Sequence, residues 1–427
     1  MRKLKFSVVV VFLIFQSIYS NAIPAFSRKY KTSCVTCHTI YPQLNAFGEA
    51  FRINGYQFPA DDEDNIKEEQ VPLGAEAYKR VWPKAVWPNF IPGSAPIALR
   101  GRSGFQITTT DSSTSSEFGL PALQLLGAGA VGKDISIFVG AHLFEKGEVG
   151  SIDRLYIKFD NLFSRFLPEK LMYLQIGQFI PEMVPFATNH RGITEAAYAF
   201  NTYDPVMGNE FAAGHTHGSM AGMSSEMEPF GIEQFQLGAE LSGVVQHRLR
   251  YVIGCVNGNG AEEDINSAKD FYGRLAYKIG GIAYDGSCKD SIKNGMETSF
   301  ALGVFGYKGT ASDTTQMDYS FSRIGGDLNF NFRKLNLVGG YIMGENAMDR
   351  ELKYNLFFGE VNYSIYPWLM GIVRYEQANL TSGNTVKRIV PHISMLIVPN
   401  VKFKIETRLD PDHLGFNNLF LGLDFAL

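Results

Sequence analysis

From residue 97 to the C-terminus, short stretches of sequence alternate apolar and polar side chains. Stretch 401–409 is the clearest case, because charged side chains occupy every second position; they are Lys402, Lys404, Glu406 and Arg408. Successive side chains of a β-strand point to opposite faces, so these charges share one face. Burying them inside a soluble sandwich would be costly, whereas a water-filled lumen keeps them hydrated. The alternation is therefore typical of strands in a transmembrane β-barrel.

Sixteen stretches are expected to form strands, at 97–110, 119–131, 134–145, 151–161, 169–179, 232–244, 247–257, 269–280, 297–308, 317–331, 334–344, 353–364, 367–378, 385–397, 400–409 and 415–427. Connections after even-numbered strands are mostly short, and those after odd-numbered strands are mostly longer. Outer-membrane barrels have short periplasmic turns and longer extracellular loops. The sequence therefore predicts an all-β fold, an antiparallel barrel of about sixteen strands spanning the outer membrane, with both termini in the periplasm. Stretch 281–296 breaks this rhythm, being long where turns should be short, and it leaves open a count that differs by two strands.

The composition agrees with a barrel and argues against some other functions. Glycine is abundant at 43 residues, aromatic residues make up 13%, and the net charge is only −4. A charge this close to zero gives no reason to expect a nucleic-acid partner. Residues 127–133 match the form G-x-x-x-x-G-K, but Asp134 stands where a phosphate-binding loop needs Ser or Thr. We expect a tight β-turn there, and no motif of a hydrolase is present.

The first residues have the form of an export signal. Arg2, Lys3 and Lys5 are basic, residues 8–15 are apolar, and small residues follow at 20–22. This is the order of a secretory signal peptide, and the apolar run is shorter than the roughly 18 residues that a membrane-spanning helix needs. Residues 1–22 are therefore expected to be a signal peptide that is removed on export from the cytoplasm of a Gram-negative cell.

Cys34, Cys37 and His38 form a C-x-x-C-H motif, the attachment signature of a c-type haem. The two thiols would form thioethers with the porphyrin vinyl groups, and His38 would be the proximal iron ligand. A disulfide or half of a zinc site are the alternatives, but zinc needs about four ligands and no second cysteine pair lies nearby. Because c-type haem is attached only after export, the signal and the motif support each other. The sequence thus predicts one covalent haem c.

Residues 23–60 are expected to form this haem segment, which is too small to bury a core of its own. It must use the haem, its many aromatic residues and a larger host, and the barrel lumen is the obvious host. The alternative is an independent small cytochrome on a tether. Residues 61–96 then follow as a linker, with an acidic run and two Trp-Pro pairs, before the barrel at 97–427. An acidic cluster can attract ferrous iron, but such a run is more often a solvated linker.

The second axial ligand of the iron is open. No methionine lies between Met1 and Met172, and no histidine lies between His38 and His142. Either the barrel supplies the ligand, or the site is open or uses Lys, Tyr or the α-amine. Stretch 180–231 is rich in soft donors, which are His190, Met207, His215, His217, Met220, Met223 and Met227. Such groups suit copper(I) or haem iron, although the stretch could instead be a lid or constriction loop that folds into the pore.

Two further cysteines, Cys255 and Cys288, lie in the barrel region. In the expected topology Cys255 is near the outer rim and Cys288 is on the periplasmic side. In that topology they would be too far apart for a disulfide, which needs Cα atoms within about 7 Å, and the sequence leaves open whether they pair. If they did pair, the expected local strand order would be wrong.

Residues 23–59 read IPAFSRKYKTSCVTCHTIYPQLNAFGEAFRINGYQFP. The positions around the haem motif that carry a resemblance are Pro24, Phe26, Arg28, Pro42, Leu44, Phe47, Gly48, Phe51, Asn54, Gly55 and Tyr56. In this pattern the segment resembles the N-terminal haem segment of the outer-membrane fused cytochrome–porin proteins of iron-oxidising bacteria. The specific match is confined to this segment, and the remainder resembles that family in length and strand rhythm.

The resemblance implies an electron-transfer protein that oxidises iron. Single electrons would pass from extracellular Fe(II) to a periplasmic c-type cytochrome, with outer-membrane lipid as the surrounding partner. Electrons could also run outward to an external acceptor. Two other readings are a solute-diffusion porin, whose haem segment is a plug or redox sensor, and a soluble periplasmic cytochrome with a β-domain.

Overall fold

The computed structural model describes residues 25–73, 80–81, 83, 89–109, 113–144, 149–150, 152–186, 191–196, 198, 235–258, 260, 267–288, 297–312, 318–345, 353–380, 385–412 and 418–427. The expected signal peptide, both tryptophans of the Trp-Pro pairs and the His and Met residues singled out in stretch 180–231 lie outside these ranges.

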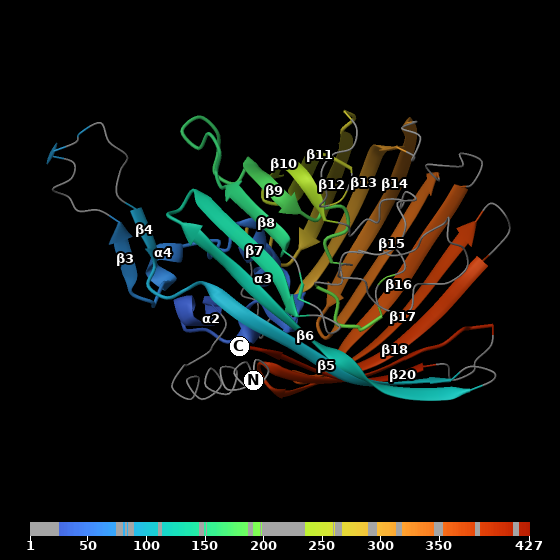
Figure 1. The fold of residues 1–427 in the computed structure, drawn as a ribbon. Coiled ribbons are helices and arrows are strands. Elements are labelled where there is room, and N and C mark those ends of the chain that lie inside the picture. The colour runs from blue at the N-terminus through green and yellow to red at the C-terminus, as the bar shows by residue number, and fades with distance from the viewer. Residues whose placement is uncertain are drawn as a thin grey trace, which may run out of the picture.

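Sixteen strands form one closed barrel, in which each strand pairs antiparallel with its neighbours in the chain and β20 pairs with β5 (Figure 1). The strands are β5 (Ile97–Thr109), β6 (Thr114–Val131), β7 (Ile135–Phe144), β8 (Ile152–Phe159), β9 (Tyr173–Phe179), β10 (Gln236–Val245), β11 (Leu249–Val256), β12 (Asp270–Gly280), β13 (Thr298–Ser312), β14 (Asp318–Phe332), β15 (Leu335–Glu345), β16 (Lys353–Tyr366), β17 (Leu369–Leu380), β18 (Thr385–Val398), β19 (Val401–Arg408) and β20 (Asn418–Ala426). The predicted sixteen-stranded barrel is confirmed.

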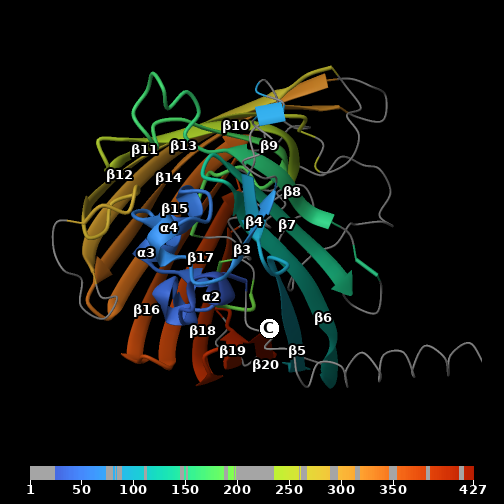
Figure 2. The same ribbon diagram turned by 90° about the vertical axis from the view of Figure 1, so that its left-hand side faces the viewer.

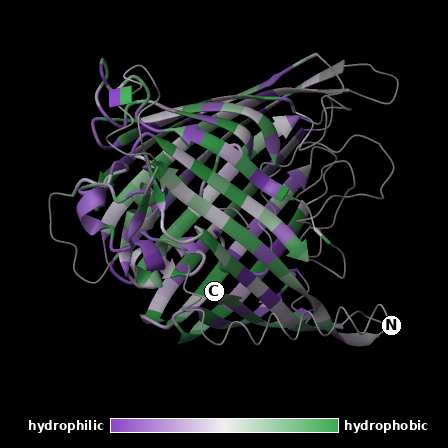
Figure 3. Ribbon diagram, turned by 60° about the vertical axis from the view of Figure 1, so that its left-hand side comes forward, coloured by the Kyte–Doolittle hydropathy of each residue, from purple (hydrophilic) through white to green (hydrophobic). Residues whose placement is uncertain are grey.

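The alternation along the strands separates two surfaces. In β19, Lys402 and Lys404 are buried inside the barrel, whereas Ile405 between the inward positions is 39% exposed on the outside. The same arrangement recurs around the wall, where the outward side chains include Ile253, Phe271, Val304, Ile324, Val373 and Leu423. Figure 3 shows hydrophilic and hydrophobic residues alternating along the strands. An apolar outer surface around a polar lumen is the distribution of a barrel surrounded by lipid.

The two ends of the barrel differ. Tight connections at 132–134, 333–334 and 399–400 lie at one end, here called the turn end, together with the C-terminus. At the first of these turns Gly132 has a φ of +66°, a conformation that glycine adopts without strain. The G-x-x-x-x-G-K stretch therefore ends in a tight hairpin turn, as expected, and its first residues belong to β6. Most of the longer connections lie at the opposite end, the loop end.

The N-terminal residues 25–66, here called the plug, sit in the turn-end mouth of the barrel (Figure 2). They contain short helices and strands, which are α2 (Ala25–Tyr30), η2 (Cys34–Thr36), β1 (His38–Ile40), β2 (Gln43–Leu44), α3 (Ala46–Ile53) and α4 (Asp62–Asn65). A two-stranded sheet of β3 (Gln70–Leu73) and β4 (Asn89–Pro92) follows. No helix in the described ranges is long and apolar enough to cross a membrane.

Aromatic rings make the core of the plug. Tyr30, Phe51 and Tyr56 are buried, and Phe26 and Phe58 pack against them. The Tyr30 and Phe58 rings stack with centroids 4.1 Å apart, and the Phe26 and Phe51 rings meet edge to face at 4.9 Å. Offset and edge-to-face pairs of this kind stabilise small cores, so the aromatic content of this segment gives it a core despite its size.

The acidic run at 61–69 differs from the expected solvated linker at its start. Asp62 accepts a hydrogen bond from the Tyr30 hydroxyl at 2.7 Å and one from the backbone N–H of Phe58 at 2.6 Å. Lys29 lies 3.5 Å from the same carboxylate. A carboxylate that holds two parts of the plug core together belongs to the plug, and only the following residues continue toward the barrel.

The long connection after β12, which broke the predicted rhythm, packs against the plug. Tyr284 contacts the cluster of Ile53, Tyr173 and Val244, and Gly286 lies against Pro59. The backbone carbonyl of Asp285 accepts a hydrogen bond from Lys170. This connection is long on the side of short turns because it supports the plug, and the strand count is unaffected.

Gly286 gives a test of this contact. Its φ is +86°, and a Cβ there would lie 2.0 Å from Cβ of Pro59. Gly286→Ala should therefore weaken plug docking by about 1–3 kcal/mol through backbone strain, and hydrogen exchange of the α3 amides should accelerate. In the control Gly359→Ala, the new Cβ meets nothing within 4 Å. Equal α3 protection in both variants would contradict the contact.

Candidate haem-binding site

The haem motif is held in one tight turn. Cys34 begins the short helix η2, and the backbone N–H of Cys37 donates to the carbonyl of Cys34 at 3.2 Å. The turn is fixed from outside by Asn45, whose side-chain amide donates to the carbonyls of Val35 and Thr36, each at 3.1 Å. The two thiols therefore belong to one rigid turn directly before His38.

Asn45 also begins helix α3, since its side-chain oxygen accepts the N–H of Gly48 at 2.9 Å. Asparagine at this position satisfies a free donor of the first helical turn. A Cβ at Gly48 would lie 2.0 Å from the carbonyl oxygen of Cys37, so only glycine lets α3 approach the motif this closely. The Asn before Ala-Phe-Gly was a readable helix-start signal, but its role in holding the haem motif was not apparent from the sequence.

The side chain of His38 is a neutral imidazole with one hydrogen-bonded ring nitrogen. Its Nδ1 lies 3.2 Å from the carbonyl oxygen of Pro42, which fits an Nδ1–H donor and leaves Nε2 as the nitrogen for a metal. Burial lowers the pKa of His38 to about 4, although the backbone carbonyl contacts partly oppose this effect. The imidazole is therefore uncharged near neutral pH, which is the form that binds a metal ion.

The thiols do not have the character of a preformed zinc site. Burial raises the pKa of Cys37 to about 12 and also raises the pKa of Cys34, so both thiols are protonated near neutral pH. A zinc site would need about two further ligands beside these thiols. Across the residues that the structure describes, no three His, Cys, Asp or Glu side chains are grouped to hold a metal ion. Cys255 lies in β11 and Cys288 in the connection after β12, and the structure records no disulfide between them.

A cavity of about 800 Å³ adjoins the motif. His38 and Val35 line it from the plug, Arg191 and Tyr198 line it from the stretch after β9, and Met370 lines it from the barrel wall. Cofactor pockets in proteins have volumes of about 300–1,000 Å³. A neutral imidazole facing a cavity of this size, directly after two thiols on one turn, fits a covalent haem.

A buried carboxylate fixes the plug to the wall. Glu182, which follows β9, accepts hydrogen bonds from Arg250 of β11 at 2.7 and 2.9 Å and from Arg52 of α3 at 3.0 Å. Glu49 pairs with Arg52 at 2.6 Å and lies 3.7 Å from Arg191. Burial alone would raise the pKa of Glu182, but Arg250 and Arg52 outweigh it and hold that pKa well below the usual range.

Polar side chains of the inner wall make further contacts with the plug backbone. Lys402 donates to the carbonyl of Tyr41 at 2.9 Å, and Lys158 donates to the carbonyl of Ile53. At another point the Tyr56 and Tyr156 hydroxyls lie 2.8 Å apart. The inward side chains that predicted a water-filled lumen thus serve, at the turn end, to hold the plug.

The described part of stretch 180–198 lies inside the barrel and is here called the inner segment. The backbone N–H groups of Glu195 and Ala196 both donate to the Glu406 carboxylate at 2.7 Å. Arg374 donates to Thr194 at 2.7 Å. Burial opposes ionisation of Glu195, but Lys404 lowers its pKa to about 2. The expectation of a segment folded into the pore therefore agrees with these residues.

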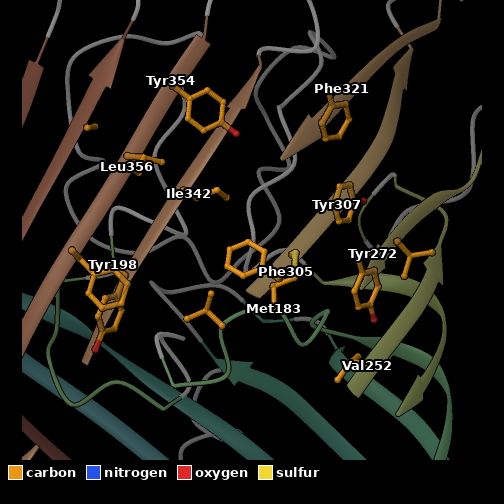
Figure 4. Packing of buried hydrophobic residues seen from close by; sticks show 14 of the residues in the cluster. Met183, Tyr198, Val252, Tyr272, Phe305, Tyr307, Phe321, Ile342, Tyr354 and Leu356 are labelled. Carbon is orange, nitrogen blue, oxygen red and sulfur yellow. The ribbon is translucent and has the colours of Figure 1, made fainter. Parts of the chain in front are cut away.

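Aromatic side chains cover another part of the lumen (Figure 4). Tyr272, Tyr307 and Phe321 come from β12, β13 and β14, and their stacked rings have centroid distances of 6.2 and 5.8 Å. The Tyr272 hydroxyl donates to Glu240 at 2.6 Å. Met183 of the inner segment belongs to the same cluster. The packing of these side chains against the inner segment could not be read from the sequence.

Comparisons with known proteins identify the fold. No profile of a known protein family matches the sequence, and no curated protein matches it. An anion-selective porin from Comamonas acidovorans aligns with a TM-score of 0.52 at 10% identity, covering 78% of this chain and 100% of that chain. OmpF of Salmonella typhi, in a complex with daunomycin, gives 0.50 at 11% identity, covering 78% and 98%. The chain is thus similar to porins in fold, and the covered share is close to that of the barrel.

Removal of the bridging carboxylate should release the plug. Glu182→Gln leaves the Arg52 and Arg250 guanidinium groups buried without their shared counter-charge, and breaking a buried pair costs about 3–5 kcal/mol. Trypsin should then cleave the plug faster while the barrel stays folded. The same substitution at Glu345, whose pair with Lys353 is exposed and 3.8 Å long, should cost less than about 1 kcal/mol. If trypsin cleaved the plug of Glu182→Gln no faster than that of the wild type, this role of Glu182 would be contradicted.

Proposed function

We propose that this protein is an outer-membrane electron conduit, in which Cys34 and Cys37 hold one haem c and His38 is its proximal ligand. The observation that carries the proposal is the haem motif itself, held inside the turn-end mouth with His38 facing a cofactor-sized cavity. A porin has no need of a thiol pair and a neutral imidazole at this place.

The proposed location follows from the barrel surface. Outward apolar and inward charged side chains suit a barrel in lipid, and the likeness to porins supports the outer membrane. Short turns face the periplasm in such barrels. The turn end, with the C-terminus and the plug, is therefore assigned to the periplasmic side, and residues 1–22 to a signal peptide.

The chain's own residues would position and insulate the redox group. When bound, a c-type haem supplies exchange of one electron at a time. The Asn45 contacts hold the motif rigid, and the Pro42 carbonyl orients the His38 ring. The aromatic core of the plug lies beside Cys37 and keeps water from that side. Burial and hydrogen bonding of this kind are what tune a haem potential.

The proposed reaction is the oxidation of extracellular Fe(II) with reduction of a periplasmic c-type cytochrome. Each Fe²⁺ loses one electron and becomes Fe³⁺, and one cytochrome gains that electron. No covalent bond is formed or broken, and no proton is transferred. Iron as the donor rests on the resemblance of residues 23–59 to fused cytochrome–porins. Flow toward an external acceptor uses the same parts in the opposite direction.

A solute-diffusion porin is the second candidate, favoured by the porin fold. The plug and the inner segment count against it, because both are tied to the inner wall by buried ion pairs and hydrogen bonds. Ionic current through planar bilayers separates the two candidates, since a plugged conduit passes little current.

Anaerobic stopped-flow mixing with Fe(II) tests the proposal. Oxidised wild-type protein should show haem absorbance that shifts to the reduced form on mixing, whereas His38→Ala should lose this reduction because the proximal ligand is gone. His247→Ala is the control, since this histidine also lies at the turn end but is largely exposed, and it should react like wild type. Purified protein without covalent haem would overturn the proposal.

A further inference from the structure

A haem iron held by His38 has a second axial position, and the plug offers no usual ligand for it. Between residues 25 and 73 the sequence contains no methionine and no histidine other than His38. The second ligand, where a side chain supplies it, therefore comes from the barrel wall or from a segment inside the lumen.

Met370 lies where such a ligand is needed. It is the second residue of β17, its side chain is 2% exposed, and the inward positions Ile372 and Arg374 that follow confirm that it faces the lumen. His38 and Met370 line the same cavity, His38 from the plug and Met370 from the barrel wall.

A packed contact brings these two parts of the chain together. Ile40 is two residues after His38 in the three-residue strand β1. Ile40 belongs to one buried cluster with Met370, Ile193 and Ile372. The strand that carries His38 is thus seated directly on the part of the wall that carries Met370.

Other donors on this cavity are less suitable. Lys278 is bound to Glu297 at 2.8 Å, and the Tyr198 hydroxyl donates to Glu360 at 3.0 Å. Burial raises the pKa of Tyr284 to about 12, which keeps it a neutral phenol. Among the described residues that line the cavity, Met370 supplies the thioether. A thioether is uncharged, needs no deprotonation and is a known haem ligand.

We propose that the sulfur of Met370 is the distal ligand of the haem iron, so that the redox centre is completed across the boundary between plug and barrel. This inference rests on the proposed function. A ligand on a barrel strand is more rigidly placed than one on a loop. A His and Met ligand pair also raises the potential of a haem, which suits an acceptor of electrons from ferrous iron.

Spectroscopy and potentiometry of three variants test this assignment. Ferric wild-type protein should show the far-red absorption band of iron bound to a thioether. Met370→Leu, a volume-conserving change that cores tolerate, should lose this band and lower the reduction potential. Met370→His should give a six-coordinate haem with a potential below that of wild type. Met343→Leu is the control, because Met343 is 48% exposed, and it should change neither property.

The outcomes separate the two proposals. Haem in the wild type, with the band and potential unchanged in Met370→Leu, would overturn Met370 as the ligand and leave the electron conduit standing. Wild type that carries haem but lacks the thioether band would do the same. Absence of covalent haem from the wild type would overturn the proposed function itself. Heat-modifiable migration on gels checks that each variant barrel is folded.

Discussion

The arrangement of this molecule depends on the buried carboxylate of Glu182, shared by Arg52 of the plug and Arg250 of the wall. Taking three charged groups out of water is costly, so such a cluster is weak evidence of added stability. Its value here is geometric. Arg250 pairs with Glu182 within the barrel, and Arg52 reaches the same carboxylate only when α3 sits at one position against β11, so displacement of the plug removes the Arg52 contact.

This fixed position of α3 determines where the haem motif lies. Asn45 and Gly48, at the start of the same helix, contact the backbone of the motif turn, so the thiols and His38 move with α3 as one body. The inner wall then determines what His38 faces, which is a cavity that Met370 also lines. Formation of the proposed redox centre therefore depends on docking of the plug. In a barrel without a docked plug, His38 would face no defined part of the wall.

Local sequence patterns predicted the strands and the haem motif of this protein. They could not predict the contacts between residues that are far apart in the sequence. Alternation fixed the strands, and even Lys402 and Lys404 were expected inside. Nothing local pairs Arg52 with Glu182, which lie 130 residues apart, or explains the long connection at 281–288 before the plug is seen against it. Met370 shows the same limit: periodicity puts it in the lumen, but its height relative to His38 depends on how the plug docks.

Electron transfer across a sealed membrane tests the central claim most directly. The protein would be reconstituted in liposomes that enclose an oxidised c-type cytochrome and a colour-forming chelator of ferrous iron, with Fe(II) added outside under anaerobic conditions. The account predicts that the enclosed cytochrome is reduced while the chelator stays uncoloured, and that the double variant Cys34→Ala, Cys37→Ala gives no reduction. Colour from the chelator, or equal reduction with the double variant, would show that the barrel passes ions rather than electrons and would contradict the account.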